Sequence, residues 1–420
     1  MPTLLFQNDT QNRLDSILYK YTHDSDSSKN IPGIVAGIAN DKSILYLGSS
    51  GVRNINAKPT SKSEIDDNKC TTDTLFLLFS TTKAFTITAL FQLIERGKCK
   101  LDDELVKYLP ELKLKKVIKS IDSTTGAMEL EDVIKQPTIK NLVTHTAGFA
   151  YAFFNEKYKS IQDNTGRGNI LGAKYEEFDV PYANQPGSKW EYGSNIDFLG
   201  EIVSRVSGVD LEEYLKENIF KPLGMNSTKF TRDESDNEKL SWLHIRDNNN
   251  NTGFATDLNF TPLKPEFKCG GHGCFGTVED YLKFLQMFLN KGVSPITGET
   301  ILKESTINEN AFKNQLNNLG EGDIKVISLP GVQPIISNDV NFYPNVLKTW
   351  SDFFMINEEE LETGRSAGSC MWTGLANLFY FIDYKKKLVG YWAESVFPFF
   401  DHASVNGFAE FETEAFKSFT

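Results

Sequence analysis

The stretch Phe79-Ser80-Thr81-Thr82-Lys83 stands where a short apolar segment meets a strongly apolar helix, predicted from about Thr81 to Arg96. The residues at 84–94 are apolar nearly all round the helix, which indicates that it is buried in the core. The pattern predicts that the helix stops at Gly97. The rest of the fold must therefore enclose this helix and leave its first turn accessible.

Ser80 and Lys83 can carry chemistry because they lie three residues apart at the start of this helix. At that spacing two side chains share a face, with Cβ atoms ~5–6 Å apart. Burial of the lysine disfavours its charge and lowers its pKa, as a proton acceptor requires. The helix N-terminus also offers unpaired N–H groups to a developing anion. A Ser-x-x-Lys match arises by chance roughly once or twice in such a chain, so the assignment needs partners elsewhere.

Strands are predicted towards both ends of the chain. Residues 34–39 and 43–48 form one predicted pair, and residues 376–383 and 388–394 form a hairpin around a turn at 384–387. Helices are predicted at 11–22 and 404–419, and residues 58–69 are predicted to form a polar loop. The middle of the chain holds predicted helices at 139–144, 196–207 and 211–219 between polar loops at 163–168 and 247–252.

This order predicts an α/β (α+β) fold with an antiparallel sheet flanked by helices and built from both chain ends. Residues 1–100 and 263–420 are assigned to the sheet domain, and residues 101–262 to an inserted, mostly helical domain.

Composition excludes several classes of function. The net charge of −12 argues against nucleic acid as a partner, because its phosphates would be repelled. No apolar run approaches the ~20 residues that span a bilayer, so no membrane role is expected. The five cysteines are odd in number and irregularly spaced, which favours free thiols in a reducing compartment, and no signal peptide is visible. We therefore expect a cytoplasmic protein.

No metal or cofactor is expected from the sequence. No Cys-x-x-Cys pair occurs, and the five histidines lack the spacing of metal ligands. No phosphate-binding loop and no Gly-x-Ser-x-Gly elbow are present.

Two further segments are candidates for the site. Tyr192 follows the turn at 185–188 and precedes a helix. Trp372-Thr373-Gly374-Leu375 comes immediately before the C-terminal hairpin. A small residue entering an edge strand lets a substrate pair with the backbone, and the Leu375 N–H is a candidate oxyanion donor. Lys348-Thr-Trp350 is not a candidate for this motif, because no glycine follows it and no hairpin is predicted after it.

The order of Ser80-Thr-Thr-Lys83, Tyr192-Gly-Ser and Trp372-Thr-Gly374 resembles the serine β-lactamase and penicillin-binding-protein-like superfamily. The likeness extends over nearly the whole chain, through segments at 141–148, 220–225 and 270–273. Trp372 stands where lactamases and peptidases usually carry a lysine. The segment from Tyr192 to Asp197 and beyond resembles the class C-like branch, with family VIII carboxylesterases and lovastatin-type acyltransferases.

The resemblance implies an enzyme in which Ser80 attacks an acyl carbonyl and passes its proton to the Lys83/Tyr192 pair. The N–H groups of Ser80 and Leu375 would hold the oxyanion, with Trp372 and Gly374 beside the substrate. The substrates would be a small-molecule ester or acyl donor and a water or alcohol acceptor, without a cofactor.

Several alternatives stay open at this point. A β-lactamase or D-Ala-D-Ala-type peptidase could use the same fold, and a non-catalytic assembly protein could retain it. Hydrolysis and acyl transfer share the acyl-enzyme. The sequence also leaves open which of Lys83 and Tyr192 is the base in acylation, the acyl group, the acceptor, the oligomeric state and the pathway.

Overall fold

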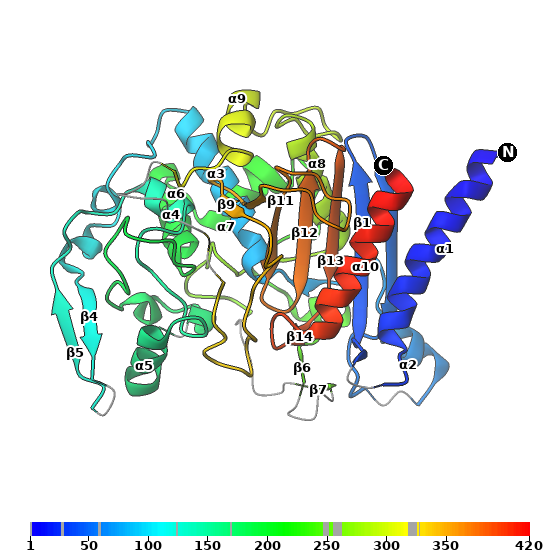
Figure 1. Ribbon diagram of the computed structural model, residues 1–420, viewed down its shortest axis with the longest axis horizontal. Coiled ribbons are helices and arrows are strands. Elements are labelled where there is room, and N and C mark those ends of the chain that lie inside the picture. The colour runs from blue at the N-terminus through cyan, green and yellow to red at the C-terminus, as the bar shows by residue number, and fades with distance from the viewer. Residues whose placement is uncertain are drawn as a thin grey trace.

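A computed structural model describes residues 2–26, 29–57, 60–122, 125–168, 170–246, 252–254, 263–317, 326 and 328–420. Its main feature is a seven-stranded antiparallel sheet built from both chain ends (Figure 1). The strand order is β2 (Ile44–Gly51), β1 (Gly33–Asn40), β13 (Leu388–Ala393), β12 (Leu378–Asp383), β11 (Cys370–Gly374), β10 (Met355–Asn357) and β9 (Lys348–Trp350). The join between the two ends is the β1–β13 pair, with Val35 opposite Ala393. The predicted fold class is confirmed.

Helices cover both faces of this sheet. On one face lie α1 (Pro2–Thr22) and α10 (His402–Phe419), which carry the two termini (Figure 1). On the other face α8 (Val278–Leu289) packs on the central strands. Every residue of β12 and β13 is therefore buried, and their sequences read as nearly continuous apolar runs rather than alternating ones.

The central helix α3 (Lys83–Glu95) is buried from its first residue to Leu93, as its sequence predicted. It packs against α6 (Asn195–Ser207) and α7 (Leu211–Leu215), which belong to the middle of the chain. Helices α4 (Ile139–Val143) and α5 (Glu156–Thr165) complete that region, with a hairpin of β4 (Val117–Ile121) and β5 (Met128–Glu131) at its outer side (Figure 1). The buried residues of α3, α6 and the sheet belong to one hydrophobic cluster.

A short pairing anchors the start of α3. Strand β3 (Phe76–Leu77) pairs with β8 (Phe275–Gly276), so the segment before β8 runs along the first turn of α3. The Leu78 N–H donates to the Cys274 carbonyl over 2.8 Å. A second small sheet joins β14 (Val396–Phe397), β6 (His244–Arg246) and β7 (Thr252–Phe254).

Some local expectations were wrong. Within the polar stretch predicted as a loop at 58–69, residues 62–67 form helix α2 (Lys62–Asp67), because the Ser61 hydroxyl caps it by accepting from the Glu64 N–H. Helix α5 continues to Thr165 before Gly166 ends it in a left-handed conformation, so the predicted loop at 163–168 starts later. The loop predicted at 247–252 lies outside the described residues apart from Thr252, which begins β7.

The Lys348–Trp350 segment was also misread, because β9 and β10 do form a hairpin, with Trp350 opposite Met355. As a result β11 is not an edge strand over its first half, where Met371 and Cys370 pair with β10. The β10 register stops at Met371, so Trp372–Gly374 keep the open edge that the sequence predicted.

Short helix α9 (Glu304–Thr306) lies after α8 in the chain. None of the helices formed by the described residues is long and apolar enough to cross a membrane.

Candidate active site

Ser80 lies in a 3₁₀ turn, Phe79–Thr82, that leads directly into α3. The residue before it, Phe79, has φ of 45°, a left-handed conformation that is costly for a bulky side chain. Of Ser80 and its immediate neighbours from Phe79 to Lys83, only Ser80 is partly exposed. The strained turn therefore presents one hydroxyl group to solvent at the N-terminus of a buried helix.

Lys83 holds its amine in a buried cradle beside that hydroxyl. The Nζ atom donates to Ser80 Oγ over 3.1 Å, to Tyr151 Oη over 3.1 Å and to the Gly271 carbonyl over 2.7 Å. It also lies over the Tyr192 ring, 4.9 Å from the centroid. The structure thus brings together Ser80 and Lys83 as their spacing predicted.

Burial lowers the pKa of Lys83 to about 7, and the negative charge of Asp197 opposes part of that shift. An amine of this pKa is neutral in a substantial fraction of molecules near neutral pH, and the neutral form has a lone pair that can accept the Ser80 proton. It meets the two requirements of a general base, hydrogen-bond reach and a pKa near the working pH.

Tyr192 reaches the same point from the segment before α6. Its neighbour Gly193 is required there, because a Cβ atom would lie 2.5 Å from the Ala150 backbone. The hydroxyl accepts a hydrogen bond of 2.9 Å from Trp372 Nε1. Burial raises the pKa of Tyr192, while hydrogen bonds with Ser80 and Trp372 act in the opposite direction. The phenol is therefore protonated at rest and contacts both Ser80 and Trp372, which belongs to the third motif, Trp372-Thr373-Gly374.

The indole of Trp372 is buried, and its N–H group is hydrogen-bonded to Tyr192. It packs edge-on against Tyr192 and Trp350, with centroids 4.8 and 4.7 Å apart. The Nε1 atom of Trp350 donates to the Val143 carbonyl over 3.1 Å, which ties the β9–β10 hairpin to α4. The hairpin that the sequence reading dismissed therefore supports the site.

Gly374 and Leu375 lie at the end of β11, close to the nucleophile turn. A Cβ atom on Gly374 would lie 2.7 Å from the Leu78 carbonyl oxygen, so only glycine allows this approach. Strand β11 contacts the 3₁₀ turn that contains Ser80. Leu375 therefore follows a strand end that packs against Leu78, two residues before Ser80.

Two further residues complete the cradle, and sequence reasoning gave neither a role. Tyr151 Oη donates to Asp197 Oδ2 over 3.3 Å, and the Gly271 N–H donates to Asp197 Oδ1 over 2.9 Å. Asp197 thus fixes Tyr151 and Gly271, two of the three groups that accept from Lys83. The available signal was the position of Asp197 in the first turn of α6, five residues after Tyr192.

The ring of His145 packs against the ring of Tyr192. His145 has φ of 54°, is fully buried, and its ring lies 4.9 Å from that of Tyr192. Burial holds the pKa of His145 well below its usual value, so it stays neutral. The histidine of the 141–148 segment therefore has a packing role.

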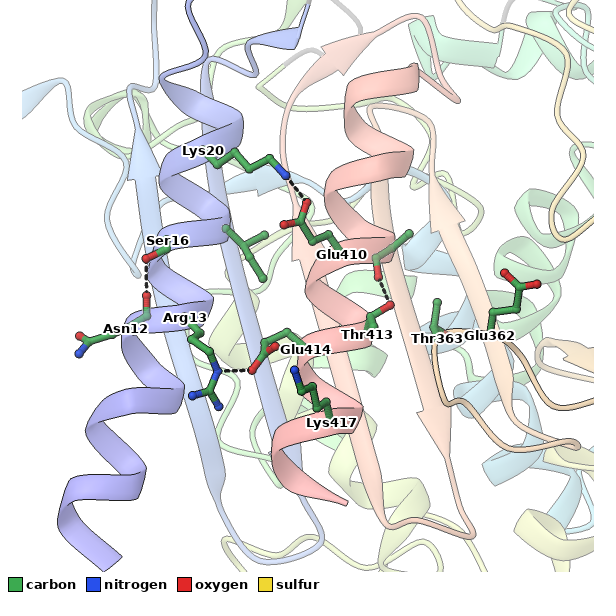
Figure 2. Close-up of a pocket in the computed structure, with 12 residues that line it drawn as sticks. Asn12, Arg13, Ser16, Lys20, Glu362, Thr363, Glu410, Thr413, Glu414 and Lys417 are labelled. Carbon is green, nitrogen blue, oxygen red and sulfur yellow. Dashed lines mark hydrogen bonds and ion pairs between the residues drawn. The ribbon is translucent and has the colours of Figure 1, made fainter.

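A separate hollow of about 840 Å³ lies between α1 and α10 (Figure 2). Ion pairs from Arg13 to Glu414 and from Lys20 to Glu410 cross it (Figure 2). None of the six predicted site residues lines it. It lies on the opposite side of the sheet from α8 and is not the site of the predicted chemistry.

The chain is similar in sequence to curated enzymes. The chain is 30% identical over 239 residues to "Acyltransferase mokF" of Monascus pilosus, which covers 54% of this chain and 56% of the relative. It is 26% identical over 367 residues to "Lovastatin esterase" of Penicillium rubens, covering 84% of this chain and 86% of the relative. The matches to the first curated relatives span about half of their length.

The fold is shared with solved structures. "Simvastatin Synthase (LovD)" from Aspergillus terreus, unliganded, matches with a TM-score of 0.76 at 23% identity, covering 97% of this chain and 98% of that one. The beta-lactamase family model matches residues 10–322, which include Ser80, Lys83 and Tyr192. Because this match covers more than half of the 420 residues, the chain belongs to the beta-lactamase family.

Proposed function

We propose that this protein is a serine acyl-enzyme hydrolase or acyltransferase that acts on carboxylic esters, with Ser80 as nucleophile. The observation that carries the proposal is the 3.1 Å contact between Lys83 Nζ and Ser80 Oγ inside a buried cradle. A neutral amine in that position can take the serine proton as the hydroxyl attacks. The curated names of an acyltransferase and an esterase among the relatives support the same reaction class.

In the proposed mechanism, Ser80 Oγ attacks the acyl carbonyl while its proton passes to Lys83 Nζ. The N–H groups of Ser80 and Leu375 stabilise the oxyanion of the tetrahedral intermediate. The intermediate collapses, the leaving alcohol takes a proton from the Lys83/Tyr192 pair, and an ester on Ser80 remains. Water or a second alcohol then attacks this ester and gives its proton to the pair, and the pair returns a proton to Ser80 Oγ as the acyl group leaves on the acceptor.

We propose neutral esters rather than β-lactams or peptides as the substrates. The Trp372 N–H is already bound to Tyr192, so the third motif offers no cation for a substrate carboxylate. Trp350 and Tyr192 surround that indole, which makes this wall of the site aromatic. A small-molecule acyl donor with a water or alcohol acceptor fits such a wall.

The test is detection of the acyl-enzyme by intact mass after exposure to a panel of p-nitrophenyl esters and thioesters. We expect one acyl group per chain, lost in Ser80→Ala, with turnover reduced by several orders of magnitude. Ser43→Ala, an exposed serine in the β1–β2 turn, is the matched control and should be acylated normally. Acylation of Ser80→Ala, or its turnover within tenfold of wild type, would remove Ser80 as the nucleophile.

We further propose that residues 1–100 with 263–420 and residues 101–262 are the two domains of the chain. All strands of the seven-stranded sheet come from the first group of residues, and helices α4 to α7 come from the second. A reducing compartment such as the cytoplasm is also proposed, because all five cysteines are free.

A further inference from the structure

Behind Lys83 lies a buried cluster of three residues that the proposed reaction does not use as reacting groups. Asp197, Cys269 and His272 each direct one ligand-type atom to a common point, and these atoms lie within 4.8 Å of one another. All three side chains are buried. The Cys269 thiol donates only a long hydrogen bond of 3.7 Å to the Phe267 carbonyl, whereas Asp197 accepts from the Gly271 N–H and the Tyr151 hydroxyl.

A tight turn creates this arrangement. The N–H groups of His272 and Gly273 both donate to the Cys269 carbonyl, over 3.1 and 2.9 Å. The turn lies directly on the start of α6: a Cβ atom on Gly271 would lie 2.6 Å from Asp197 Oδ2. The close approach at Gly271 thus lets Cys269 and His272, three residues apart, both lie near Asp197.

The imidazole of His272 is the least satisfied group of the cluster, because its Nε2 has no partner. Neither ring nitrogen has a hydrogen bond, although the side chain is buried. Its Nδ1 lies 3.2 Å from Asp197 Oδ1. Two ligand atoms on a tetrahedral zinc ion, each ~2.0–2.1 Å from the metal, are separated by about 3.3 Å.

We propose that Asp197, Cys269 and His272 bind a divalent transition metal, with zinc the preferred ion. Thiolate, imidazole and carboxylate are the ligands that zinc takes in proteins, whereas calcium and magnesium require oxygen sets. The carboxylate is already oriented by the Gly271 N–H and the Tyr151 hydroxyl, as metal-bound carboxylates usually are. A fourth ligand, water or the nearby Glu177 carboxylate, would complete the tetrahedron.

The metal would stabilise the cradle of the catalytic amine. Gly271, whose carbonyl accepts from Lys83 Nζ over 2.7 Å, lies between the two ligands supplied by the turn. Asp197 holds Tyr151, the second acceptor from Lys83. The site was not expected from the sequence, because the third ligand is far from the Cys269-x-x-His272 pair and only folding brings it there.

The experiment measures metal directly and does not depend on turnover. Purified full-length protein is analysed for bound zinc by elemental mass spectrometry, and metal-free protein is titrated with Co²⁺ while absorbance is followed. We expect about one metal per chain and a sulfur-to-cobalt charge-transfer band, since a thiolate is among the ligands. Cys269→Ser and His272→Asn should each weaken metal binding at least tenfold.

Cys274→Ser is the matched control, because Cys274 is equally buried five residues away and outside the cluster. It should bind metal as wild type does. Wild-type protein that takes up no stoichiometric metal would overturn the proposal and leave His272 as a direct neighbour of Asp197. A cobalt complex without the sulfur band, or equal binding by Cys269→Ser and Cys274→Ser, would also overturn it. The wild-type spectrum decides even where a variant fails to fold.

Discussion

Replacing Lys83 with methionine keeps most of the apolar stem of the side chain and removes its titratable amine. Burial lowers the pKa of this amine to about 7, from an ordinary value of 10.5. In the unfolded chain the pKa returns to about 10.4. Between these two pH values the unfolded state binds a proton that the folded state does not bind. Folding of the wild type must therefore release this proton, at a cost in free energy that the variant does not have.

The sign and size of the effect follow from this difference. Stability rises with pH wherever the unfolded state binds more protons, by ~1.4 kcal/mol per pH unit for one proton. Relative to Lys83→Met, the wild type should therefore gain stability from about pH 7 upward, until the unfolded lysine itself loses its proton. Over two pH units in this window the relative gain is about 2–3 kcal/mol. Below the folded pKa both states are protonated, and the difference should stay constant.

The assay is urea unfolding of both proteins at about pH 7, 8 and 9, with the free energies of unfolding compared at each pH. The variant should be catalytically dead, and wild-type kcat/KM should fall about tenfold per pH unit below the Lys83 pKa. A difference in stability that does not change with pH would refute the reasoning, since it would mean that Lys83 keeps an ordinary pKa and is charged at rest.

Three other outcomes test the remaining assignments. Tyr192→Phe should reduce kcat by roughly 10²–10⁴-fold without changing the melting temperature by more than a few degrees. Tyr151→Phe also removes a hydroxyl beside Lys83, but it should reduce kcat less, because Tyr192 and not Tyr151 contacts Ser80. Equal losses of kcat in the two variants would contradict the choice of Tyr192. Trp372→Phe should lower kcat several-fold by freeing the Tyr192 hydroxyl, measured with p-nitrophenyl butyrate, and an unchanged kcat would make that hydrogen bond irrelevant. Wild-type kcat/KM should be higher for p-nitrophenyl butyrate than for nitrocefin, and the reverse order would show that Trp372 was misinterpreted.

Much of the fold could be predicted because its central elements have unambiguous periodicity. The helix after Ser80 is apolar on all sides, and the Leu378–Asp383 and Leu388–Ala393 strands flank a clear turn. The errors fall where short elements depend on distant partners. Strand β9 is three residues long and exists because it pairs with β10 and because Trp350 reaches the Val143 carbonyl. No local pattern records such contacts.

The site was predictable to the extent that its residues lie in recognisable segments. Ser80 and Lys83 are close in sequence, and Tyr192 follows a turn at a helix start. The Tyr151 and Asp197 side chains and the Gly271 carbonyl come from three separate segments, and each has an ordinary local role as an aromatic, a first-turn acid or a turn glycine. Their shared function appears only when folding places them around one amine.

The third motif differs from the other two in how it joins the site. The family match ends at residue 322, so it contains Ser80, Lys83 and Tyr192 but not Trp372, Gly374 or Leu375. Trp372 and Gly374 lie on β11 and Leu375 follows it, and β11 is joined to the other chain end through β12 and through β13, which pairs with β1. The nucleophile and its base depend on a helix that forms from neighbouring residues, whereas the proposed oxyanion donor and the Tyr192 hydrogen bond depend on closing the whole sheet. Damage to the β1–β13 join should therefore remove activity before it removes the Ser80–Lys83 contact, because the local pair survives longest when long-range pairing fails.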